Sequence, residues 1–228
     1  IGDRRQRQMC IRDRIIPAPE FLSTGEIEHL CDGGGSCDYS GTVYNGGLRF
    51  EALNEFTLNS IKVYAGLEGA RTFELRNTGL DQIFESTTID IPVSEENGFV
   101  VNLNWTIPAG EYIITTDSDL NNSNFGDNNP MLKRTTGGLA TFPHILDDVV
   151  SINDGYYNNE GNNTEGAGFS TSYYYYFYDW KINNEWEIGG VSCSSDLLEV
   201  DVIVNNNNSN IEETSSLDFG FFPNPAFK

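Results

Sequence analysis

The residues best suited to bind a ligand form an aromatic run at positions 173–180, which reads YYYYFYDW. Seven of these eight residues carry aromatic rings, in a chain that is 12% aromatic overall. Flat rings stack on the apolar faces of sugars, and tyrosine hydroxyl and indole N–H groups add hydrogen bonds at the rim. The run therefore predicts either a ligand-binding surface or an aromatic core.

Aromatic residues favour β-strands, in which successive side chains point to opposite faces. One face of such a strand would carry Tyr173, Tyr175, Phe177 and Asp179. The other face would carry Tyr174, Tyr176, Tyr178 and Trp180. We expect this second face, with Trp186 close by, to bind the ligand. The alternative is that the same rings fill the core of the domain.

A second candidate site is the polar segment 117–130, DSDLNNSNFGDNNP. Side-chain oxygens at alternate positions of a loop converge on hard cations such as Ca²⁺. The oxygens would come from Asp117, Asp119, Asn121 and Asp127. An EF-hand needs glycine and glutamate where this segment has Asn122 and Asn128, so we expect a different kind of calcium loop. The alternative is a solvated loop without metal.

The sequence contains no recognisable catalytic motif, neither a Gly-x-Ser-x-Gly elbow nor a His-Glu-x-x-His helix. The only histidines, His29 and His144, lie far apart in the chain. Neighbouring acids such as Asp147 and Asp148 would point to opposite faces of a strand, which does not favour a catalytic pair. We therefore expect no enzyme activity. A fragment of a polysaccharide-active enzyme remains an alternative.

Two cysteines, Cys31 and Cys37, enclose a segment with three consecutive glycines. Glycines allow a tight turn, so we expect a disulfide between these two residues, as is typical of oxidising compartments. Cys193 is an alternative partner for either cysteine. The Cys-x5-Cys spacing is not that of a zinc site.

The chain is strongly acidic, with 34 Asp and Glu residues against 13 Lys and Arg and a formal charge of -21. Such a surface repels phosphate backbones and anionic membranes, so nucleic acid is excluded as a partner. No apolar run approaches the ~20 residues that span a bilayer. High charge keeps an extracellular protein soluble, and we expect this one outside the cell or on its outer surface.

The elements that must position these residues are short strands, because apolar residues alternate with polar ones from Leu48 onward. The alternating segments are 56–64, 71–77, 87–93, 99–105, 111–116, 149–152 and 197–204. Their regular spacing, without a convincing helix, predicts an all-β, jelly-roll-like antiparallel β-sandwich over residues 48–204. We expect an irregular, loop-rich segment at 15–47 and a surface loop at 155–168.

Both ends of the chain differ from this domain. Residues 1–14 contain the string RQMCIRDR, which resembles translated sequencing-adapter read-through in metagenomic reading frames. We expect this segment to be an artefact outside the fold, the alternative being a basic arm. We expect residues 205–216 to be an Asn/Ser-rich linker that leads into a disordered tail.

The last segment, 217–228, contains Phe222-Pro-Asn-Pro225 after the polar linker. This pattern resembles the opening of the C-terminal sorting domain of the type IX secretion system. The resemblance implies export through that machinery. The body of a sorting domain does not follow, so we expect a fragment truncated at both ends.

The order of motifs from Phe56 to Trp180 resembles a β-sandwich module of multidomain bacterial secreted proteins. The matching motifs are SIKVY at 60–64, IPAGEY at 107–112, LKRTTGG at 132–138, FP at 142–143, VVSI at 149–152 and the aromatic run. Such modules accompany peptidases, glycan-active enzymes and adhesins. The resemblance implies a non-catalytic accessory module, with a polysaccharide or cell-surface glycan as partner. A structural or adhesin-like spacer ahead of the sorting signal is the alternative.

Overall fold

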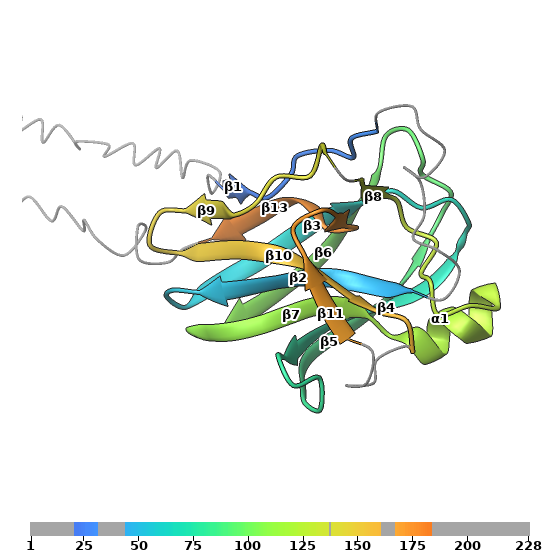
Figure 1. The fold of residues 1–228 in the computed structure, drawn as a ribbon, viewed down its shortest axis with the longest axis horizontal. Coiled ribbons are helices and arrows are strands. Elements are labelled where there is room, and N and C mark those ends of the chain that lie inside the picture. The colour runs from blue at the N-terminus through green and yellow to red at the C-terminus, as the bar shows by residue number, and fades with distance from the viewer. Residues whose placement is uncertain (1–20, 32–43, 137, 161–166, 184–228) are drawn as a thin grey trace, which may run out of the picture. The chain divides into compact units, whose positions relative to one another are not determined.

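The computed structural model describes residues 21–31, 44–136, 138–160 and 167–183 (Figure 1). All of them belong to the first of two compact units, which covers residues 1–191. The expected artefact, linker, sorting segment and last strand lie outside the described residues, as do Cys37, Trp186 and Cys193. The Cys31–Cys37 disulfide therefore stays a prediction.

The described residues form two antiparallel sheets and a short ribbon. The smaller sheet has the order β1 (Leu22–Thr24), β13 (Tyr178–Asn183), β3 (Phe56–Val63) and β6 (Phe99–Ile107). The larger sheet has the order β11 (Ala167–Ser170), β10 (Val150–Asn158), β2 (Asn45–Ala52), β7 (Gly110–Thr116), β4 (Gly69–Asn77) and β5 (Ile83–Ile91). Strand β9 (His144–Leu146) also pairs with β10, while β8 (Arg134–Thr135) and β12 (Tyr174–Tyr175) form the ribbon.

The strand pairs nest around the turn between β4 and β5. Moving outward from that turn, β3 pairs with β6, β2 with β7 and β1 with β13, alternately in one sheet and the other. A long hairpin rolled up in this way is a jelly roll, so the expected all-β sandwich is confirmed. The segment between β7 and β13 is inserted into this plan and supplies the ribbon and the edge strands around β10.

The local pattern predicted most of the strands, with three corrections. The sandwich begins before residue 48, because β1 pairs with β13 and β2 already starts at Asn45. The expected loop after β7 contains helix α1 (Ser118–Phe125), because Asp117 caps its first turn and Gly126 ends it in a left-handed conformation. The expected loop at 155–168 is shorter, since β10 continues to Asn158.

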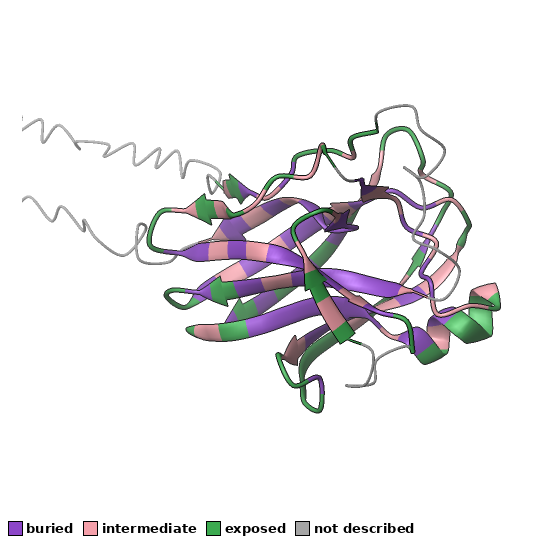
Figure 2. Cartoon of the chain, in the orientation of Figure 1, coloured by how far each residue is buried: buried purple, intermediate pink, exposed green. Residues whose placement is uncertain are grey.

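The core between the sheets is apolar and aromatic. Figure 2 shows buried residues along the strands of both sheets. Its fully buried large side chains include Leu48, Phe50, Leu58, Ile61, Phe73, Phe177 and Trp180. The Trp180 ring meets the Phe50 ring edge-on at 5.1 Å between centroids. This contact links β13 of the smaller sheet to β2 of the larger one.

The aromatic run belongs to this core, and the expectation of one continuous strand with an exposed ring face is wrong. Tyr176 and Asp179 have positive φ angles of 66° and 45°, which break the alternation. The residues expected to bind ligand, Tyr174, Tyr176, Tyr178 and Trp180, are each 0% exposed. The Tyr174 hydroxyl and the Trp180 indole N–H both donate to the Phe177 carbonyl, at 3.0 and 2.8 Å. The core alternative is therefore correct for these four rings.

Candidate functional site

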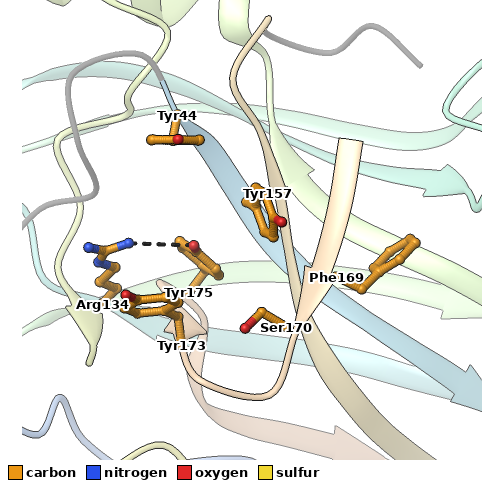
Figure 3. Close-up of a pocket in the computed structure, with 7 residues that line it drawn as sticks. All are labelled: Tyr44, Arg134, Tyr157, Phe169, Ser170, Tyr173 and Tyr175. Atoms are coloured by element: carbon orange, nitrogen blue, oxygen red, sulfur yellow. Dashed lines mark hydrogen bonds between the residues drawn. The ribbon is translucent and has the colours of Figure 1, made fainter. Parts of the chain in front are cut away.

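A pocket of about 490 Å³ lies where the ribbon meets strands β2, β10 and β11. Figure 3 shows its lining side chains, which come from well-separated segments of the chain. They are Tyr44, Arg134, Tyr157, Phe169, Ser170, Tyr173 and Tyr175. Clefts of this size, lined by aromatic side chains and a few polar groups, are typical of small-molecule sites.

Glycines make room for these rings on the larger sheet. Tyr157 on β10 is in register with Gly46 on β2 and with Gly168 on β11. A Cβ atom at Gly168 would lie 2.5 Å from the Tyr157 ring, and one at Gly46 would collide with the Tyr175 ring. The two tyrosine rings therefore lie directly on glycine backbone, where no larger residue fits without moving them.

Arg134 is the only charged residue among the described side chains that line the pocket. Its guanidinium carbon lies 4.2 Å from the Tyr173 ring centroid and 5.7 Å from that of Tyr175. Nη1 also donates to the Tyr175 hydroxyl at 3.4 Å (Figure 3). Cation–π attraction to the two rings and this hydrogen bond hold the guanidinium against the pocket wall.

The remaining rings surround the opening at different angles. Tyr44 and Tyr157 meet edge-on at 6.0 Å between ring centroids, and Tyr173 and Tyr175 are tilted by 45° at the same separation. Burial raises the pKa of the Tyr175 hydroxyl to about 12, although Arg134 acts to lower it. The hydroxyl is therefore protonated at neutral pH. Together these groups offer flat apolar surfaces beside hydrogen-bond donors.

The pocket is lined by residues from the face of the aromatic run that the sequence analysis did not predict to bind a ligand. Tyr173 and Tyr175 line the cavity, whereas Tyr174 lies in the core. The sequence interpretation also missed Tyr44, Arg134 and Tyr157. A signal was present in the glycines at 46, 155 and 168, because glycines within strands mark close approach of other groups.

The segment expected to bind calcium instead holds the end of β7 to helix α1. Asp117 Oδ1 accepts hydrogen bonds from the backbone N–H groups of Asp119 and Leu120, at 2.9 and 3.3 Å. Asn121 is fully buried, and its amide donates to Thr116 Oγ1 at 2.9 Å. Asp127 Oδ1 accepts from a backbone N–H two residues on, at 3.2 Å.

The expectation of an open loop is therefore wrong for this segment, because helix α1 begins at Ser118, while calcium binding there stays a prediction. Asp119 is exposed in the first turn of the helix, where a negative charge is favourable. Among the residues that the structure describes, no three His, Cys, Asp or Glu side chains are grouped so that they could hold a metal ion.

The two histidines pack against aromatic rings and do not line the pocket. His29 lies 5.9 Å from Tyr64 and 6.4 Å from Tyr178 between ring centroids. His144 lies edge-on to Tyr174 at 5.4 Å, and burial lowers its pKa. Ring packing of this kind is typical of histidines with a structural role.

No protein-family model matches the chain, and its comparison with curated proteins and with solved structures gave no significant match. In the described part of the chain, no helix has the length and apolar character needed to cross a membrane. The chemistry of the pocket itself is therefore the basis for a functional proposal.

Proposed function

We propose that this chain is a non-catalytic accessory module that binds carbohydrate in the pocket formed by Tyr44, Arg134, Tyr157, Tyr173 and Tyr175. The observation that carries the proposal is the set of tyrosine rings around one cavity, with a guanidinium among them. Sugars have apolar C–H faces and a rim of hydroxyl groups. Tyrosine rings accommodate the first, and the Arg134 and Ser170 donors accommodate the second.

The secretory context is part of the same proposal. The acidic surface, the motif order between 56 and 180 and the Phe222-Pro-Asn-Pro225 segment support an extracellular or cell-surface module exported by the type IX machinery. Its partner would be a polysaccharide or a cell-surface glycan. An attached module of this kind would hold a neighbouring domain close to such a polymer.

A structural spacer is the second candidate function. The observation that favours it is the complete burial of Tyr174, Tyr176, Tyr178 and Trp180, because these rings stabilise the sandwich and are inaccessible to a ligand. A spacer needs a stable fold and no binding site. The two candidates therefore differ in whether the half-buried rings of the pocket, Tyr44, Tyr157 and Tyr173, have a ligand.

A glycan array probed with the full chain tests the proposal. We expect binding to at least one class of polysaccharide, and we expect Tyr173→Ala to weaken it by about fivefold or more. Phe84→Ala is the matched control, since Phe84 is 45% exposed on β5, at the opposite edge of the larger sheet from β11. If no glycan binds, the carbohydrate proposal fails and the spacer is favoured. If both variants bind as the natural chain does, the pocket is not the binding site and the proposal fails in its assignment of the site.

A further inference from the structure

Three of the four arginines in the described part of the chain have their donors matched by strong acceptors. Arg49 Nε donates to Asp154 Oδ1 at 3.0 Å, and Arg76 Nε donates to Glu74 Oε2 at 2.7 Å. Arg71 is fully buried and donates to three backbone carbonyl oxygens, at 2.7, 2.8 and 2.8 Å. The fold thus supplies carboxylate or carbonyl oxygens to each of these guanidinium groups.

Arg134 is the exception within the described residues. Its only hydrogen bond to a described residue is the 3.4 Å contact with the Tyr175 hydroxyl, and its buried Nε has no acceptor among the residues that the structure describes. It forms no ion pair with a described carboxylate. A partly desolvated cation without an opposite charge is unfavourable, because burial removes hydration that nothing replaces.

We propose that Arg134 recognises an anionic group, a carboxylate or a sulfate ester, on the sugar that the pocket binds; this rests on the proposed carbohydrate function. A guanidinium presents a planar fork of N–H donors that matches two oxygens of either anion. The cation–π contact with Tyr173 holds the guanidinium in the pocket before the ligand arrives. The sugar ring would lie against the neighbouring tyrosines while its acidic substituent pairs with Arg134.

Two other ligand classes fit the pocket less well. Aromatic cages bind quaternary ammonium groups, but here such a cation would lie beside a guanidinium that already occupies the Tyr173 ring. A neutral sugar would leave the charge of Arg134 uncompensated. The formal charge of -21 opposes acidic polymers at long range, yet it is screened over about 8 Å at physiological salt.

The test compares charged polysaccharides with their neutral counterparts by isothermal titration calorimetry of the full chain. The first pair is polygalacturonate and its methyl ester. The second pair is a sulfated galactan and the same polymer after desulfation. We expect at least tenfold tighter binding to the charged member of one pair, and the pair concerned identifies the anion. Added salt should weaken that preference.

Three variants test whether the preference depends on Arg134. Arg134→Gln should remove it, while Lys62→Gln, which deletes one positive charge on β3 outside the pocket, should leave it unchanged. Arg134→Lys keeps the charge without the fork and should retain part of the preference. If Arg134→Gln does not fold, as judged by thermal melting, the comparison of the two polymer pairs with the natural chain decides alone.

The outcomes separate this inference from the function on which it rests. Equal affinity for charged and neutral members would overturn the inference and leave carbohydrate binding in place. A preference that survives Arg134→Gln would also overturn it. No binding to any of the four polymers, together with a blank glycan array, would overturn both.

Discussion

The guanidinium of Arg134 lies 4.2 Å from the centre of the Tyr173 ring. The two residues are distant in sequence, since Arg134 begins β8 and Tyr173 directly precedes β12. The β8–β12 ribbon brings them together, because Arg134 on β8 pairs with Tyr175 on β12. This ribbon has only two residues on each side. The proposed binding site therefore depends on the small β8–β12 ribbon, in which β12 lies against β2 and β10 of the larger sheet.

Tyr173→Ala tests the role of the ring in binding. We expect glycan affinity to fall by about fivefold or more, since a stacked ring contributes about 1 kcal/mol beyond its buried area. The melting temperature should change little, because Tyr173 is half-buried and lies outside a long strand. Calorimetric titration and thermal melting of the same variant provide both values. An unchanged affinity would contradict the assignment of the pocket.

Tyr174→Phe tests the neighbouring ring, which lies in the core. The variant loses the hydrogen bond from its hydroxyl to the Phe177 carbonyl, while Trp180 still donates to that oxygen. We expect the free energy of unfolding to fall by about 1 kcal/mol, with glycan binding unchanged. Urea denaturation measures this, with Tyr173→Phe as the control that should leave stability unaltered. Lost binding at full stability would argue against a core role.

Asp117→Ala tests whether this residue caps a helix or binds a metal. Loss of the two hydrogen bonds to the backbone should lower the free energy of unfolding by about 1 kcal/mol. The loss should be equal in calcium and in chelator, because the cap uses no ion. Asp119→Ala, at an exposed position, should have a smaller effect. If calcium stabilises the natural chain but not Asp117→Ala, the calcium-loop prediction is supported and the purely structural role of Asp117 is contradicted.

Glu26→Gln tests the buried carboxyl of Glu26, which is 6% exposed. Burial raises the pKa of this carboxyl above its ordinary value of 4.5, against hydrogen bonds with Thr135 and Thr141 that act to lower it. The folded state thus holds the proton more tightly than the unfolded state. Its contribution to stability is complete below pH 4.5 and is lost as pH rises through the higher folded pKa.

Glutamine cannot ionise, so Glu26→Gln should lack this loss. We expect the variant to gain stability relative to the natural chain as pH increases above 4.5, and the difference to become constant above the folded pKa. Urea denaturation from mildly acidic to neutral pH measures the difference. Glu51→Gln, at an exposed position on β2, controls for the loss of one negative charge. A difference that does not vary with pH would contradict the proposed desolvation.

The sequence by itself determined the long strands of the sandwich, although not the short strands β1, β8, β9 and β11. In β6, for example, Val101, Leu103 and Trp105 are buried while the residues between them are exposed, as the period of two predicts. Alternation is a local property of an extended chain, so it can be read without knowing the partner strand. The type of fold followed from the number and spacing of such segments.

Only the tertiary structure decided which rings are available to a ligand. Positive φ angles at Tyr176 and Asp179 interrupt the aromatic run, so alternation no longer assigns its side chains to two faces. Tyr44, Arg134 and Tyr157 reach the same cavity through the pairing of strands that are distant in sequence. Which face is covered depends on that long-range pairing and on the glycines that admit the rings, because burial is set by neighbours in space.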